Sequence, residues 1–316
     1  MRNQVKIRLL FLAVFIIGLS ETFAQAVAQN AEAIKVTAVY NSSTEQHLFQ
    51  LEQDTIPMGW TTFRFVNASP AVHFMILEDF PGDRTTEDVE REVGPVFQGA
   101  MDLLTEGKTE EGYAKLGDLP AWFSEVVFRG GSGLIMPGAE TRFTTYLEPG
   151  NYGIECYVKA EDGTFHSMMG MFEDLYVTEQ DSGNPEPADP TLDVYTTNEG
   201  FNIGGEFKAG KNLVAVHFDE EREGMTGKDV HIVKVEEGTN LEEVATWMDW
   251  SQPKGLISGH MGNSPVPTQF LGGTQEGPEG ATYYFHIDLE PGKYAMVAEM
   301  PANAPAYKVF EVKEEQ

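Results

Sequence analysis

The chain contains a single cysteine, Cys156, and the segment that follows it includes His166 and Met171. A thiolate, an imidazole and a thioether are side chains that bind copper and other soft or intermediate metal ions. A lone cysteine cannot form a disulfide within its own chain. Cys156 is therefore a buried structural thiol, an oxidation-prone thiol, or a metal ligand held as thiolate.

The cysteine stands near the end of a predicted strand. The sequence LEPGNYGIEC places a Pro-Gly turn between two strand candidates, residues 143–147 and 152–158, which predicts an antiparallel hairpin. Side chains alternate across a strand, so Cys156 shares a face with Ile154 while Glu155 points to the other face. The residues between the cysteine and the downstream histidine are expected to form a loop.

These motifs resemble those of the cupredoxins, the blue copper proteins. In that family a strand with the pattern LxPGxYxxxC carries the thiolate ligand and is followed by His and then Met. The first His lies far upstream, after an Asn-containing turn, and this chain has Asn67 six residues before His73. The resemblance implies one type 1 copper ion. Its equatorial ligands would be His73, Cys156 and His166, and its axial ligand would be Met171.

The resemblance covers most of residues 34–178, and the sequence departs from the family at several positions. Val72 and Phe74 flank the upstream His where the family often has Pro and Asn. The nearby Met168 and Met169 leave the choice of axial ligand open among three methionines.

The loop between the cysteine and the downstream histidine is long for a small electron carrier. It is closer in length to the loop of copper nitrite reductases. Those enzymes have a His directly before the Cys, bridging to a second copper, and this chain has Glu155 there. The sequence therefore predicts no catalytic copper.

The second half of the chain repeats the first without its cysteine. Residues 146–152 read YLEPGNY and residues 288–294 read DLEPGKY. Upstream, the Val-His pair at His73 matches the pair at His231. Aligning the turns places Ala298 opposite the cysteine, and no His follows Ala298. Copper is therefore predicted in the first domain only.

Short apolar segments separated by Gly- and Pro-rich turns indicate strands. We predict a mostly β fold of two cupredoxin-like Greek-key β-sandwiches, each with a small helical insertion. The insertions are expected after the His-bearing strands, at about 85–104 and 109–115 and at 240–247. We predict a signal peptide with a short lead-in at 1–28 and a domain with the copper site at 29–178. A linker at 179–190 then leads to a second domain at 191–316.

The N-terminus has the pattern of a signal peptide: Arg2, Lys6 and Arg8 precede an apolar run at 9–19, and small residues follow. This predicts an exported protein, periplasmic or secreted, with no membrane span in the mature form. The net charge of −29 disfavours nucleic acid as a partner. A redox partner protein is the partner that fits a copper carrier.

The function predicted from these features is copper binding for electron transfer or copper handling outside the cytoplasm. The alternative is a metal-free cupredoxin-like binding module for a protein or small-molecule partner. The sequence has no Ser-His-Asp set, phosphate loop, HExxH helix or paired His-x-His motif, and the chain is predicted not to be an enzyme.

Overall fold

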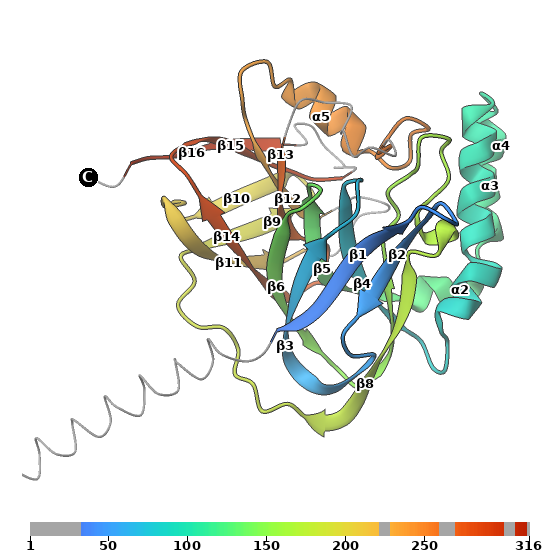
Figure 1. Cartoon of the computed structure of the whole chain (residues 1–316), viewed down its shortest axis with the longest axis horizontal. Coiled ribbons are helices and arrows are strands. Elements are labelled where there is room, and N and C mark those ends of the chain that lie inside the picture. Colours follow the sequence, from blue (N-terminus) through green and yellow to red (C-terminus); the bar gives the residue numbers. More distant parts are fainter. Residues whose placement is uncertain (1–32, 221–227, 259–268, 300–306, 315–316) are drawn as a thin grey trace, which may run out of the picture.

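The computed structural model describes residues 33–220, 228–258, 269–299 and 307–314 (Figure 1). The predicted signal peptide at 1–28 lies outside the described residues. Within the described ranges, no helix is both long enough and apolar enough to cross a bilayer.

Eight strands build the first half, and they are short segments with alternating or continuous burial. In chain order they are β1 (Ile34–Asn41), β2 (Gln46–Leu51), β3 (Thr55–Asn67), β4 (His73–Phe80), β5 (Val127–Ile135), β6 (Glu140–Leu147), β7 (Gly150–Glu155) and β8 (Phe172–Asp181). The Pro-Gly turn joins β6 to β7 as predicted, although these two strands enter different sheets instead of pairing as a hairpin.

Eight strands also build the described part of the second half. They are β9 (Leu192–Thr197), β10 (Gly200–Gly204), β11 (Gly210–Phe218), β12 (Val230–Lys234), β13 (Gln269–Thr274), β14 (Thr282–Leu289), β15 (Gly292–Val297) and β16 (Tyr307–Val312). The pairings repeat those of the first half. For example, β1 runs parallel to β3 as β9 does to β11, and β4 lies between β5 and β7 as β12 lies between β13 and β15. The predicted mostly β fold with two sandwiches is confirmed.

The two sandwiches are joined edge to edge in both of their layers (Figure 1). In one layer β6 pairs antiparallel with β14, and Phe143 lies opposite Phe285. In the other layer β5 meets β13 at Ile135 and Leu271. Since β6 and β14 are equivalent strands, as are β5 and β13, the two halves meet in the self-complementary manner of a two-fold dimer. One hydrophobic core runs through both halves.

The strand register corrects one alignment made from the sequence. His231 pairs with Val297 on β15 and Gly273 on β13, whereas the residue in the same position on β4 is Ile76, which pairs with Glu155 and Gly131. His231 is therefore equivalent to Ile76 and not to His73. The short Val-His match was misleading because register is set by pairing with distant strands and not by a dipeptide.

Helices follow β4 and β12, as predicted. The first insertion contains α2 (Thr86–Glu92), α3 (Gly94–Thr105) and α4 (Thr109–Lys115), followed by the 3-10 turns η1 (Leu116–Asp118) and η2 (Ala121–Glu125). Thr85 and Asp88 form a capping box at the start of α2, which explains why the helix begins there. The second insertion is α5 (Leu241–Met248), capped by Asn240.

The first insertion packs on the outer face of the sheet that contains β4 and β8. Val89 and Val93 of the helical segment form a small separate cluster with Phe80 and Phe172 of the strands. Figure 1 shows α2, α3 and α4 as a layer on the outside of the first sandwich. This arrangement leaves a space between helices and sheet that is described below.

The predicted linker at 179–190 is only partly free of regular structure, because β8 extends to Asp181. Its side chains contact the body of the protein: Asn184 donates to the carbonyl oxygen of Trp60, and Glu186 accepts from the hydroxyl of Tyr284. The boundaries of the domains remain predictions.

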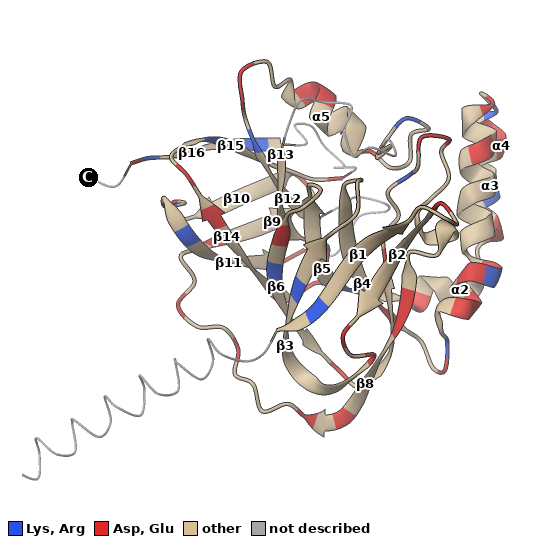
Figure 2. Cartoon of the chain, viewed as in Figure 1, with Lys and Arg blue, Asp and Glu red and all other residues tan. Residues whose placement is uncertain are grey.

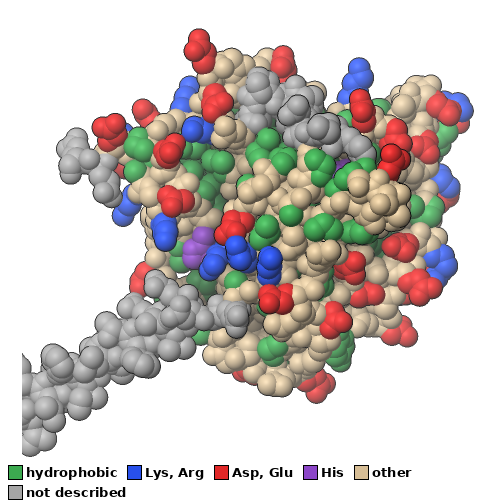
Figure 3. Space-filling model, viewed as in Figure 1, with side chains coloured by type: hydrophobic (Ala, Val, Ile, Leu, Met, Phe, Trp, Pro, Cys, Tyr) green, Lys and Arg blue, Asp and Glu red, His purple; other side chains and the backbone are tan. Residues whose placement is uncertain are grey.

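Acidic residues are spread over the strands, loops and helices α2 to α4 (Figure 2). A small basic group interrupts them on the face seen in Figure 3, where Lys35, Arg64 and Arg142 surround Glu140. Arg64 forms an ion pair with Glu140 across strands β3 and β6. The charge of the chain is therefore dominated by acidic groups without being uniform.

Candidate metal centre

Three of the four predicted ligands converge in the core of the first sandwich. His73 is the first residue of β4, and its Nδ1 lies 3.5 Å from the Sγ of Cys156, directly after β7. The Nδ1 of His166 lies 3.3 Å from the Nδ1 of His73. All three side chains are fully buried. The strands and the loop therefore place the Cys156 thiol and the His166 imidazole beside His73.

The distances from His73 Nδ1 to the sulfur and to His166 Nδ1 fit a shared metal ion, whereas the three residues whose ligand-type atoms all lie within 4.8 Å of one another are His47, His73 and His166. Metal–nitrogen and metal–sulfur bonds of about 2.0–2.3 Å at angles near about 110° place neighbouring ligand atoms about 3.3–3.5 Å apart. The set of one sulfur and two imidazole nitrogens suits copper. The Nε2 of His73 is buried and has no hydrogen-bond partner among the described residues, so Nδ1 is the nitrogen that faces the other ligand-type atoms.

Met171 is the best placed of the three methionines considered as axial ligand. It is fully buried, its backbone N donates to the carbonyl oxygen of His166, and its carbonyl oxygen accepts from the backbone N of Cys156. Met168 is 37% exposed and lines a cavity on the other side of the loop. Met169 is partly buried.

A third histidine, His47 on β2, was missed by the sequence reasoning. Its ring stacks on that of His166 with centroids 4.1 Å apart and lies edge-on to that of His73 at 4.9 Å. Nitrogen atoms of the three rings all lie within 4.8 Å of one another. The available signal was the alternation of β2, in which His47 and Phe49 are the two buried positions.

The turn before β4 fixes the position of His73. The side chain of Asn67 donates to the carbonyl oxygens of Ala71 and Ile135 and accepts from the backbone N of Ser69. These bonds close the turn and tie it to the neighbouring strand β5. The predicted role of an Asn-containing turn before the upstream histidine therefore has a direct physical basis.

Without metal the Cys156 thiol and the His73 imidazole are uncharged at neutral pH. Burial raises the pKa of the Cys156 thiol to about 12, although backbone N–H groups of Phe74 and Val158 that hydrogen-bond to the sulfur oppose this shift. Burial, and then the neighbouring His47, hold the pKa of His73 well below its ordinary value. A metal ion would have to displace the thiol proton, and the two backbone N–H groups would then stabilise the thiolate.

The second half covers the loop that carries His166. Lys159 in this loop is buried, and its Nζ donates to the carbonyl oxygens of Trp250 and Gln252 at 2.9 and 2.6 Å. Ser258 donates its backbone N to the carbonyl oxygen of Lys159, and its hydroxyl accepts from the backbone N of Val72. Burial lowers the pKa of Lys159 to about 7.

The second half holds a different buried cluster near the join between the sandwiches. The Nε2 of His231 lies 2.6 Å from a carboxylate oxygen of Asp229 and 3.4 Å from one of Glu299. Its Nδ1 accepts a hydrogen bond from the backbone N of Leu134 in the first half. Because Nδ1 accepts this hydrogen bond, a proton on Nε2 faces Asp229. Burial opposes the charged form of His231, but Asp229 and Glu299 outweigh it and raise the pKa to about 9. This cluster links the halves, and its three groups present ligand-type atoms that all lie within 4.8 Å of one another.

Glu155 faces away from the cysteine, as the alternation of the strand predicts. It forms a buried hydrogen-bonded pair with Glu78 of β4 on the outer face of the sheet. Burial raises the pKa of both carboxyl groups above their ordinary range. The position next to the thiolate is therefore occupied by an acid pair and not by a metal-binding imidazole.

Comparisons with known proteins were made by sequence and by structure. No protein-family model and no curated relative matches the chain. A multicopper oxidase is 13% identical, covers 88% of both chains and has a TM-score of 0.24. Auracyanin A, a "blue" copper protein from Chloroflexus aurantiacus, is 20% identical, covers 46% of this chain and 98% of its own, and has a TM-score of 0.27. The Cu-containing nitrite reductase from Thermus scotoductus is 12% identical, covers 89% and 61%, and has a TM-score of 0.23.

The prediction that the chain is not an enzyme is wrong, because the comparisons do not exclude an enzyme. The matched structures include an oxidase and a nitrite reductase, both of which are enzymes, and each match extends over most of this chain. The prediction depended on the absence of short catalytic motifs. Short motifs do not test for groups that distant residues form in the fold, as Glu78 and Glu155 do.

The matches are to proteins of the class that the sequence resembles, although their TM-scores are too low to support conclusions about the site. The fold is supported by the repeated strand pairing, and the site by the distances between ligand-type atoms. The chain resembles the cupredoxins both in its thiolate motif and in its pair of β-sandwiches.

Proposed function

We propose that this protein binds one copper ion in the first half, with His73, Cys156, His166 and Met171 as ligands. The observation that carries the proposal is the convergence of Cys156 Sγ, His73 Nδ1 and His166 Nδ1, with neighbouring atoms 3.5 and 3.3 Å apart. Such a set suits both oxidation states of copper, so that the bound ion can accept and release one electron.

The residues of the chain contribute a rigid, dry environment. The three converging side chains and Met171 are all fully buried, and the backbone hydrogen bond from Cys156 to Met171 holds the two ends of the ligand loop together. A site fixed by the fold changes little when its charge changes, which favours rapid electron transfer. We therefore propose electron transfer or copper handling as the role, with a redox partner protein.

We also propose that the protein is exported, on the basis of the signal-peptide pattern at 1–28. The test is N-terminal sequencing of the protein recovered from the periplasm or medium of an expression host. A new N-terminus near residues 25–29 is expected. An intact Met1 in a cytoplasmic protein would contradict export.

The test of copper binding is titration of metal-free protein with Cu(II), followed by optical spectroscopy and metal analysis after gel filtration. One copper per chain and strong visible thiolate-to-copper absorption are expected. Cys156→Ser should remove the absorption, whereas Met168→Leu, a change at an exposed methionine, should retain it. Colourless protein without bound copper would overturn the proposal and favour a metal-free binding module.

A further inference from the structure

A cavity of about 440 Å³ lies between the helical insertion and the outer face of the first sandwich. Residues from α2, α3 and η2 form one side, and residues from β4 and β7 form the other. Its size is within the range of pockets that bind small organic molecules. None of the four proposed copper ligands lines this cavity.

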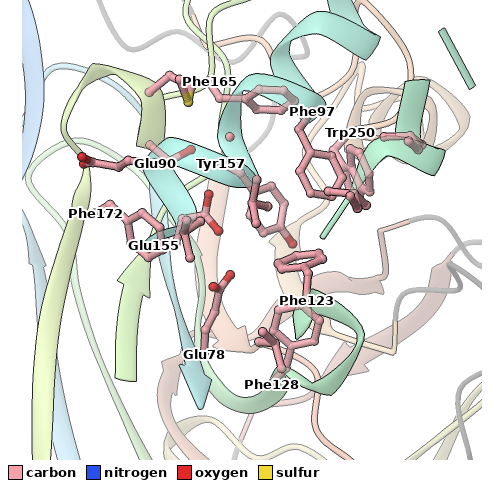
Figure 4. Close-up of a pocket in the computed structure, with 18 of the residues that line it drawn as sticks. Glu78, Glu90, Phe97, Phe123, Phe128, Glu155, Tyr157, Phe165, Phe172 and Trp250 are labelled. Atoms are coloured by element: carbon pink, nitrogen blue, oxygen red, sulfur yellow. The ribbon is translucent and has the colours of Figure 1, made fainter. Parts of the chain in front are cut away.

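The walls of the cavity are largely aromatic. Figure 4 shows the rings of Phe97, Phe123, Phe128, Tyr157 and Trp250 around the space. Aromatic rings contact flat apolar molecules well, and their faces also attract cations. The walls therefore favour a ligand with a flat apolar body.

The floor of the cavity is acidic. Glu78 and Glu155 point toward one another there, and Glu78 is only 2% exposed (Figure 4). The Oε2 of Glu78 has no hydrogen-bond partner among the described residues. A buried carboxyl oxygen without a partner is costly, so this atom is a place where an N–H donor would bind.

The remaining charges of the lining have the same sign. Glu90 and Glu276 also line the cavity, and none of the described lining residues is Lys, Arg or His. An anionic ligand would therefore meet carboxyl groups and no cationic side chain, whereas an ammonium group could donate to the carboxyl oxygens. The charge of the lining selects among the ligands that the aromatic walls would accept.

We propose that this cavity binds an organic cation, an ammonium group carried on an aromatic body. The ammonium would donate to Glu78 on the floor, and the body would lie among the rings of Phe97, Phe123 and Trp250. The proposal does not depend on copper, since Glu155 and the cysteine occupy opposite faces of the same strand. A bound ligand would nevertheless lie one strand away from the metal ligands.

The experiment compares three probes that differ in charge and share a phenyl body: 2-phenylethylammonium, 2-phenylethanol and phenylacetate. Binding to the full protein is measured by isothermal titration calorimetry, with and without added copper. The ammonium is expected to bind at least about tenfold more tightly than the alcohol, because its bond to Glu78 is charge-assisted. Phenylacetate is expected to give no detectable heat.

Two variants and a control assign the binding to the cavity. Glu78→Gln should weaken ammonium binding by at least about tenfold, whereas Glu279→Gln, at an exposed acid outside the cavity, should leave it unchanged. Phe123→Ala should weaken both the ammonium and the alcohol, and it serves as the second variant if Glu78→Gln does not fold. Equal binding of ammonium and alcohol, or no binding of any probe at millimolar concentration, would overturn the proposal.

Discussion

The two halves of the chain share the same strand pairing and differ in the polar residues that they bury. After β7 the first half places Cys156 beside two histidines, and at the aligned position after β15 the second half has Ala298. The second half instead buries His231 between two carboxylates. The same sandwich thus supports a cluster of a thiol and imidazoles in one half and a cluster of an imidazole and two carboxylates in the other.

This difference shows which buried polar groups serve the fold. His231 is held at both ring nitrogens, by the backbone N of Leu134 and by Asp229. The Nε2 atoms of His73 and His231 both lack a hydrogen bond of good geometry among the described residues, but only that of His231 has carboxylate oxygens within ion-pair distance. Buried polar groups are normally satisfied, so an unsatisfied one suggests a role outside stability.

The largest expected effect comes from exchanging the residues that distinguish the halves. Cys156→Ala gives the first half the residue of the second and should abolish thiolate-to-copper absorption. Substitution of a residue next to a metal ligand typically lowers metal affinity by about 10–100-fold, and the loss of copper affinity in Cys156→Ala should be larger than that. Ala298→Cys should give no coloured copper site, because counting back three residues from the equivalent pair Ile76 and His231 places Lys228 at the position of His73. Colour in the Ala298→Cys protein would break the comparison.

The second prediction contrasts the two histidines in metal-free protein. His231→Leu leaves two buried carboxylates without their partner and should reduce the free energy of unfolding by about 3–5 kcal/mol. His73→Leu removes a buried imidazole whose Nε2 is unsatisfied and should change stability by less than about 1 kcal/mol. Urea unfolding monitored by fluorescence measures both. Equal losses would show that the first cluster is also structural.

The third prediction concerns a backbone feature that the halves share. Gly131 and Gly273 have φ of 152° and 134°, and a Cβ at either position would lie 2.0 or 1.7 Å from the carbonyl oxygen of Met75 or Val230. Ala at either site should destabilise the protein by about 3 kcal/mol or more. Gly82→Ala is the control for left-handed backbone in open space, since no atom lies near its Cβ position. A mild effect at only one of the paired glycines would weaken the structural equivalence.

The fourth prediction is a gradual pH dependence from Lys159, which joins the ligand loop to the second half. Its pKa is about 7 in the folded protein and about 10.5 in the unfolded chain. Below pH 7 both states are protonated and the burial penalty is fully present. Between pH 7 and 10.5 the unfolded chain binds more protons, so stability rises by up to about 1.4 kcal/mol per pH unit.

Lys159→Met should therefore lose this rise, so that its deficit relative to the parent protein grows from pH 7 to pH 9.5. Lys211→Met, at an exposed lysine on β11, should keep the parent slope. Urea unfolding at four pH values measures the difference. A deficit that stays constant with pH would contradict the assigned protonation of Lys159.

The sequence by itself determined the features that depend on neighbours along the chain. The Pro-Gly turns, the helix α4 at Thr109–Lys115 and the thiol-to-imidazole spacing are local, and all were recognised from residue type and order. The duplication was also evident, because the two turn motifs are nearly identical in sequence.

Only the tertiary structure decided which distant residues meet. It brought His47 from β2 to the candidate centre, paired Glu78 with Glu155 across β4 and β7, and shifted His231 away from equivalence with His73. These contacts depend on strand register, which is fixed by the packing of whole sheets and the closure of long loops. A residue pattern predicts which face of a strand a side chain occupies. The register of the neighbouring strand determines which side chains it contacts.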